Sequence, residues 1–165
     1  MKRNISRLGL ITVLTIILML CSNAGATTLL KMSLDEITNN ANEIVLGTVQ
    51  GSSYQWDLDN SQIYTYSKIN VEKVIKGNAE TKEITVKTPG GEIDKVIMEV
   101  PGSPELKQGQ KCIVFLYNAD PRYLSNLVGF TQGKFTVVDN VVQENGKTVE
   151  EFINEIILII DTHEQ

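Results

Sequence analysis

The sequence predicts a mainly β fold, a small antiparallel barrel with a short helix before it and a closing helix after it. The first observation is residues 63–77, the longest segment rich in β-branched and aromatic residues, which predicts one long strand with two faces. The second is a series of shorter apolar segments separated by glycine, proline and asparagine. The third is an apolar pattern at helical spacing near the end of the chain. A long, bent strand joined to short ones suits a small, strongly coiled barrel.

Residues 1–26 have the pattern of a signal peptide, and we expect cleavage after Ala26. A positively charged start is followed by an apolar run over residues 8–20, which is shorter than the ~20 residues that a membrane-spanning helix needs. A cysteine at the end of this run, Cys21, leaves lipid attachment open, although residues 18–20 lack the small residue that a lipoprotein signal requires. We therefore expect a protein that is secreted or held in the cell envelope.

The expected mature chain is acidic and short. Removal of the first 26 residues changes the net charge from −5 to −8, because 12 basic residues then face 20 acidic ones. Phosphate backbones and anionic lipids repel such a chain, so we expect no nucleic acid partner, and membrane contact only through the signal segment or lipid on Cys21. Residues 27–165 fit a single domain. They retain one cysteine, Cys112, and can form no internal disulfide.

Helix-capping motifs and the alternation of apolar and polar residues predict the elements in the first half of the domain. A capping box predicts a short helix over about residues 34–41. Residues 43–50 are apolar at nearly every position and predict a strand covered on both faces for part of its length, in which Gly47 marks a bend or a close backbone approach. A polar loop is expected over residues 51–62. The long strand then loses its alternation near residues 72–73, which predicts a bulge there.

The second half is expected to consist of shorter strands. Residues 111–117, apolar at both parities, predict a central strand, and residues 127–130 and 134–138 are expected to pair as a hairpin. Further strands are expected over residues 83–88, 93–100 and 141–143.

A second capping box predicts a closing helix over residues 148–161 that docks on the barrel. Its apolar stripe consists of Val149, Phe152, Ile153, Ile156, Ile157 and Ile160. Leu158 and Ile159 lie off that stripe. Burial is the expectation for them as well, with a contact patch for a second copy as the alternative.

The chain offers no set of residues for catalysis. Its one histidine, His163, lies close to the end of the sequence, so a histidine metal site or a serine–histidine pair is not expected. Cys112 stands in an apolar run with no base beside it, which is typical of a buried core cysteine. We expect neither enzymatic activity nor a cofactor.

Aromatic residues near the start of the long strand are the candidate binding residues. Exposed aromatics at the rim of a barrel can bind an extended ligand or a partner protein, whereas tyrosines on a strand face can also simply pack against their neighbours. The candidates are Tyr54, Trp56, Tyr64 and Tyr66.

Asp57 and Asp59 are weak candidates for a metal site. They offer oxygen ligands at alternate positions, as the start of a calcium loop does. The closing bidentate carboxylate is missing, because Lys68 stands there, and Gln62 stands where the loop glycine is required. These positions favour an ordinary solvated loop.

Several stretches of the chain follow one known order of elements: residues 40–49, the strand end at residues 74–77, residues 106–117, and the segment GFTQGKF at residues 129–135. This order resembles the netrin-like branch of the OB-fold barrels, the fold of the inhibitory domain of tissue inhibitors of metalloproteinases. It also resembles a group of uncharacterised secreted bacterial proteins. Those inhibitors begin with a disulfide-bonded cysteine that chelates the protease zinc, whereas here the expected first residue is Thr27. The resemblance thus implies the barrel and leaves that mechanism without support.

The expected function is that of an exported, non-enzymatic module that binds another exported or envelope protein, with a protease as one such partner. The strand at residues 63–71 and the loop at residues 51–62 would form its surface. The alternative is an envelope module or a lipoprotein that binds an oligosaccharide or calcium in the same region.

Overall fold

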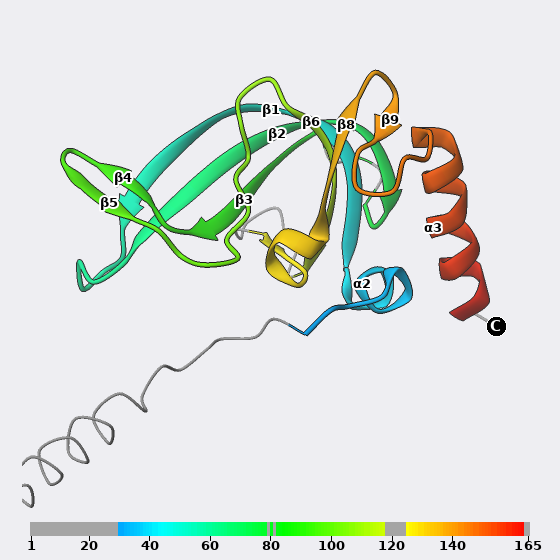
Figure 1. Cartoon of the computed structure of the whole chain (residues 1–165), viewed down its shortest axis with the longest axis horizontal. Helices are drawn as coiled ribbons and strands as arrows, with labels where there is room; N and C mark the ends of the chain where they lie inside the picture. Colours follow the sequence, from blue (N-terminus) through cyan, green and yellow to red (C-terminus); the bar gives the residue numbers. More distant parts are fainter. Residues whose placement is uncertain (1–29, 79, 81, 118–124, 164–165) are drawn as a thin grey trace, which may run out of the picture. The chain divides into compact units, whose positions relative to one another are not determined.

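Antiparallel strands dominate the described part of the chain, which is mainly β and contains two helices (Figure 1). The computed structural model describes residues 30–78, 80, 82–117 and 125–163. The predicted signal segment, with Cys21 and Ala26, lies outside these residues. The described elements are α2 (Leu34–Asn40), β1 (Glu43–Trp56), β2 (Ile63–Lys76), β3 (Glu83–Pro89), β4 (Gly91–Ile93), β5 (Val96–Met98), β6 (Lys111–Tyr117), β7 (Asn126–Leu127), the 3-10 turn η1 (Phe130–Gly133), β8 (Lys134–Val138), β9 (Val141–Val142) and α3 (Val149–His163).

The described strands form a seven-stranded sheet in the order β3-β2-β1-β6-β8-β9, with β7 paired to β6, and a separate hairpin of β4 and β5. The expectation of a central strand at β6 is confirmed, because β6 pairs with β1, β7 and β8. The expected hairpin of residues 127–130 with 134–138 is wrong. Both segments instead pair antiparallel with β6, one after the other along it, because η1 is inserted between them without reversing the chain. The strand expected over residues 93–100 is a hairpin, with Asp94 in its tight turn at φ +55°.

β1 and β2 form a long two-stranded blade that is bent by bulges. The predicted bulge near residues 72–73 is confirmed, since Leu46 pairs with Lys73 and Gly47 with Val71, which leaves Glu72 unpaired. The loop expected over residues 51–62 is confirmed for residues 57–62 and wrong for residues 51–56. β1 continues to Trp56, so the connection narrows to the turn after it, because these polar residues pair with β2 across their whole length.

The sheet buries a core on each of its faces, and β1 and β6 contribute to both. One face, here called the inner face, carries Val45, Val49, Ile69, Ile84, Val86, Leu106, Cys112, Val114, Leu116 and Leu127. The opposite, outer face of β1 and β6 carries Ile44, Leu46, Ile113 and Phe115 against the two helices. Such alternate burial explains why both strands are apolar at nearly every position. The prediction that β1 is covered on both faces is confirmed.

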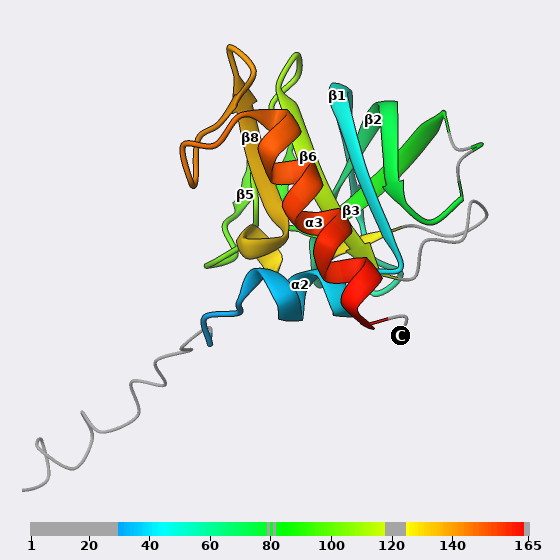
Figure 2. The same cartoon turned by 90° about the vertical axis from the view of Figure 1, so that its right-hand side faces the viewer.

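The two helices cover the outer face of the sheet (Figure 2). Phe152 of α3 packs on Phe135 of β8 with their ring centroids 4.7 Å apart. Both predicted capping boxes are confirmed, at Ser33 with Glu36 and at Thr148 with Glu151. Four of the six stripe residues of α3 are buried: Val149, Phe152, Ile153 and Ile156.

Further along α3 the expectation of burial is wrong for two residues. Ile157 is 38 % exposed and Leu158 is 66 % exposed. The reason is the angular width of the contact, because a helix on one sheet face buries a single stripe: Ile157 lies at the edge of that stripe and Leu158 lies outside it.

Candidate functional site

The inner face changes character along the blade, and the candidate site begins where it changes. Val49 and Ile69 face each other as buried core residues. One step further the facing pair is Ser52 and Ser67, whose hydroxyls lie 2.8 Å apart. Beyond these serines the inner face carries mainly hydroxyl and aromatic side chains, together with the buried Ile63 opposite Trp56.

A groove of about 970 Å³ lies over this part of the inner face. Residues of β1, β2 and β3 form its floor. Its wall is formed by the β4–β5 hairpin and by the segment that follows it, which Figure 1 shows crossing the sheet. The residues that line it are Ser52, Tyr54, Thr65, Thr88, Pro89, Gly90, Gly91, Glu92, Ile97, Met98, Glu99, Val100, Pro101, Ser103, Pro104, Glu105, Leu106, Lys107 and Gln108.

The hairpin is fixed to the blade at a close approach. The amide of Gly90 donates to the carbonyl oxygen of Ile63 at 2.8 Å, and the Thr65 hydroxyl donates to the carbonyl oxygen of Gly90 at 2.7 Å. Gly91, at φ +141°, lies so near Tyr54 that a Cβ there would come within 2.7 Å of the ring carbon Cδ1. This wall of the groove is therefore held in place.

The wall that runs from β5 to β6 is anchored at both ends. The Ser103 hydroxyl donates to the carbonyl oxygen of Pro89 at 2.6 Å, and Leu106, 7 % exposed, inserts into the inner core. Pro101 and Pro104 restrict the backbone between these anchors. A groove with fixed walls can bind a ligand at a low entropic cost.

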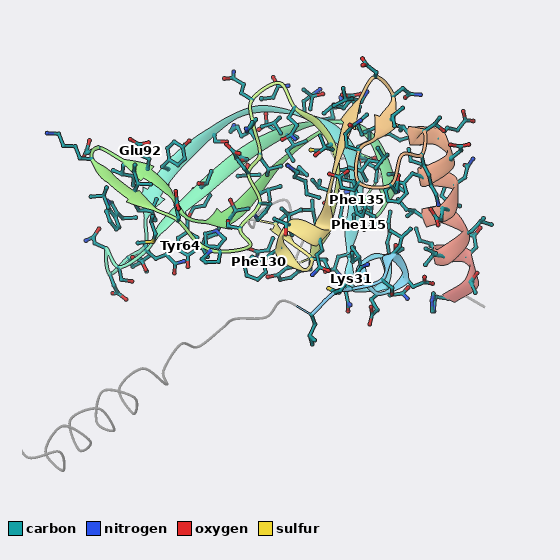
Figure 3. The ribbon with its side chains drawn as sticks, viewed as in Figure 1. Lys31, Tyr64, Glu92, Phe115, Phe130 and Phe135 are labelled. Atoms are coloured by element: carbon teal, nitrogen blue, oxygen red, sulfur yellow. The ribbon has the colours of Figure 1, made fainter. Side chains whose placement is uncertain are left out.

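Negatively charged side chains outnumber positively charged ones in the lining of the groove. Its lining contains three carboxylates, those of Glu92, Glu99 and Glu105, and one ammonium group, that of Lys107. Lys107 is paired with Glu105 at 3.3 Å. Figure 3 shows Glu92 at the hairpin end of the molecule, away from Phe115 and Phe135 beneath α3.

The blade separates the four candidate aromatics into two pairs on opposite faces. Tyr54 faces Thr65 and Trp56 faces Ile63, so both lie on the inner face, and Tyr54 lines the groove at 48 % exposure. Tyr64 and Tyr66 alternate with these positions and lie on the outer face. One contact surface therefore cannot include all four side chains.

On the outer face, Tyr64 is half-buried and already has a partner. The ammonium group of Lys87 lies 3.7 Å from the centre of its ring, a cation–π contact that stabilises the β2–β3 pair. Tyr66 borders a smaller hollow of about 320 Å³, which is also lined by Gln50, Gly51, Ser52, Ser53, Lys68 and Thr85.

The Asp57 carboxylate organises the turn between β1 and β2. It accepts hydrogen bonds from the Ser61 amide at 2.7 Å, the Ser61 hydroxyl at 2.8 Å and the Gln62 amide at 3.1 Å. The Ser61 hydroxyl, followed by the Gln62 amide, lowers the pKa of Asp57. These bonds occupy the oxygens that a calcium ion would need, so the geometry gives Asp57 a structural role.

Neither Cys112 nor His163 lies at the groove. Burial raises the pKa of the Cys112 thiol to about 11, so at neutral pH this side chain is a protonated core residue. The Nε2 atom of His163, at the end of α3, lies 2.9 Å from the Asn39 amide of α2. It joins the two helices on the outer face.

Sequence reasoning missed most of the groove, because one wall of it comes from the segment after β5. The available signal was the placement of Thr65 and Ser67 on the inward parity of the long strand, where aliphatic residues would complete a core. Hydroxyl side chains at such positions indicate a face that is open to a ligand or to water.

Neither metal-ligand geometry nor similarity to known proteins indicates a second functional site. Within residues 30–78, 80, 82–117 and 125–163, no group of three or more His, Cys, Asp or Glu side chains is placed to hold a metal ion. The described helices include none that is long and apolar enough to cross a membrane. No protein-family model matches the chain, and no match is found among curated proteins. Function is therefore inferred from the groove.

Proposed function

We propose that this chain is an exported, non-enzymatic binding module that takes another exported or envelope protein in the groove of its inner face. The observation that carries the proposal is the groove itself, an open hollow with fixed walls beside exposed apolar side chains. The large apolar residues exposed at this end are Tyr54 at 48 %, Leu58 at 101 %, Val96 at 46 % and Ile97 at 66 %. Exposed aromatic and aliphatic residues around a hollow are typical of protein-binding surfaces.

The proposal includes a barrel of the OB type, related to the netrin-like domains. Two backbone hydrogen bonds support it: the Lys87 amide donates to the carbonyl oxygen of Ser125 at 2.8 Å, and the Ser125 amide donates to that of Thr85 at 3.1 Å. Ser125 runs parallel to β3 and leads into β7, which pairs with β6. Such a contact brings β3, at one edge of the sheet, next to the chain that leads into β7, as the closing of a barrel requires. A protease is the partner class that this resemblance suggests.

The test is affinity capture of the host's exported proteins on residues 27–165. A variant with Tyr54→Ser and Ile97→Ser removes the apolar groove contacts, and Val138→Ser, at a 49 % exposed position on β8, serves as the matched control. We expect the parent and the control to capture the same protein and the groove variant to lose it while its circular dichroism stays unchanged. Equal capture by all three would contradict the proposal. Any protease recovered is assayed for inhibition.

A small-ligand function is the second candidate, and the hollow beside Tyr66 favours it. Gly51 leaves its floor open, since a Cβ there would meet nothing within 4 Å. An aromatic ring next to amide, hydroxyl and ammonium groups suits an oligosaccharide unit. A glycan array with parent and Tyr66→Ala proteins tests this function, which requires binding that the variant loses.

A further inference from the structure

We infer that the groove takes an extended, positively charged segment of the partner, a stretch of chain that carries lysine or arginine side chains. This inference rests on the proposed function and adds the chemistry of what is bound. Three properties of the groove carry it: the charge of its rim, an unpaired hydroxyl on its floor, and its length.

The rim has an excess of negative charge. Glu92 and Glu99 have no ion-pair partner within the part of the chain that the structure describes, whereas Lys107 is neutralised by Glu105 at 3.3 Å. Three carboxylates against one ammonium group leave the lining with a net charge of −2. Charges arranged in this way attract a cationic partner, speed its association and disfavour an acidic one.

The floor presents a hydroxyl that a bound chain can reach. Thr88 lines the groove and is only 4 % exposed, and its hydroxyl makes no hydrogen bond with the described residues. Its facing residue on β2, Thr65, already donates to the carbonyl oxygen of Gly90. The Thr88 oxygen is not among the fully buried side-chain atoms that lack a partner, so it is open to water, and a backbone carbonyl or amide of a bound chain would replace that water.

The groove is long rather than compact. Nearly every residue from Ile97 to Gln108 lines the wall, and residues of β1, β2 and β3 form the floor. On this wall the carboxylate of Glu99 stands among apolar side chains, with Ile97 and Met98 before it and Val100 after it. An extended chain that carries both apolar and cationic side chains matches such a wall better than a rounded ligand does.

The experiment uses three eight-residue peptides in which valine alternates with lysine, with glutamate or with serine. Binding is followed through the fluorescence of Trp56, which is the one tryptophan of the chain and lies on the inner face beyond Tyr54. We expect the lysine peptide to bind most tightly and the glutamate peptide least tightly, and added salt to weaken the lysine peptide alone. Equal affinity for the lysine and glutamate peptides would overturn the inference.

Variants of the groove test whether its carboxylates cause the preference for the lysine peptide. Glu92→Gln together with Glu99→Gln should raise the Kd of the lysine peptide about fivefold, since each exposed charge pair contributes modestly. Glu150→Gln with Asp161→Asn, exposed on α3, removes the same net charge elsewhere and should leave Kd unchanged. Thr88→Val should weaken all three peptides alike. A groove variant that binds the lysine peptide as the parent does would refute the charge assignment.

The two proposals fail in different ways. If Tyr54→Ser with Ile97→Ser leaves capture of the exported partner unchanged, the groove is not the binding surface. If that variant loses the partner while Glu92→Gln with Glu99→Gln captures it at full affinity, the surface is right and the cationic segment is wrong.

Discussion

The Ser52 and Ser67 hydroxyls lie 2.8 Å apart on facing strands and mark the boundary between the inner core and the groove. Ser67 is completely buried, whereas Ser52 is exposed at the groove. The pair is therefore asymmetric. Without Ser52, the Ser67 hydroxyl loses its partner in a place that water reaches poorly, but without Ser67 the Ser52 hydroxyl can bond to water.

This asymmetry predicts an unusual order of stabilities. Ser52→Ala should lower the free energy of unfolding by about 1–2 kcal/mol, because it leaves a buried hydroxyl unsatisfied. The double variant Ser52→Ala with Ser67→Ala should be more stable than the single Ser52→Ala variant, since it removes both hydroxyls. Urea unfolding measures both, with Ser53→Ala on the outer face as the control. Additive losses in the double variant would contradict this account.

Gly47 carries a second prediction. A Cβ at this position would collide with the carbonyl oxygen of Asn70 on β2 and lie 2.7 Å from Cγ2 of Ile69. Because the first of these atoms is backbone within a paired strand, it cannot move aside without breaking the register. Gly47→Ala should therefore lower the free energy of unfolding by about 1–3 kcal/mol.

Gly51 supplies the matched control for this experiment. It lies four residues further along β1, and a Cβ there would meet no atom within 4 Å. Gly51→Ala should be neutral in the same urea titration. Equal losses at the two glycines would point to strand propensity rather than to the close approach at Asn70.

The expectation of a close backbone approach at Gly47 is confirmed, and it illustrates what the sequence makes visible. Local signals predicted both capping boxes, the bulge at Glu72 and the central position of β6, because each depends on a short stretch of chain. These features require no knowledge of what lies across the sheet.

The errors arose where polar residues gain their structure from distant partners. Residues 51–56 lack apolar alternation, yet they extend β1 because β2 supplies a full ladder of hydrogen bonds. That extension places Tyr54 and Trp56 on the opposite face from Tyr64 and Tyr66. The groove wall at residues 99–108 has no regular secondary structure, so periodicity could not predict its position.

Glu72, the residue that the register skips, predicts a dependence of stability on pH. Its carboxylate accepts from the Lys111 ammonium group at 2.5 Å and from the Thr48 hydroxyl at 2.6 Å. These bonds, that of Lys111 first, lower the pKa of Glu72 from its ordinary value of 4.5. A lowered pKa in the folded state stabilises the fold above pH 4.5, and this stabilisation is lost as the pH falls through the lower folded value.

Glu72→Gln should therefore reduce the free energy of unfolding at pH 7 by about 0.5–1 kcal/mol, a small amount because solvent screens the partly exposed pair. The difference from the parent should shrink below pH 4.5 and at high salt. Glu83→Gln, which breaks the more exposed Lys68–Glu83 pair, is the control and should have less effect. A difference that stayed constant from pH 7 to pH 3 would show that charge plays no part.

Substitution of Asp57 tests whether its carboxylate stabilises a turn or binds calcium. Its carboxylate holds the turn through Ser61 and Gln62, so Asp57→Ala should lower the Tm by a few degrees in calcium and in a chelator alike. Asp59→Ala should leave the Tm near that of the parent, because no hydrogen bond of the Asp59 side chain is present among the described residues.

The stabilisation by Asp57 should also depend on pH. Its hydrogen bonds to Ser61 and Gln62 lower the pKa of Asp57, so the stabilisation of the fold is complete above the ordinary pKa of 3.8 and is lost as the pH falls through the lower pKa of the folded state. Differential scanning calorimetry between pH 7 and pH 3 measures both effects, and a calcium-dependent rise in Tm that Asp57→Ala abolished would restore the metal site in place of the turn.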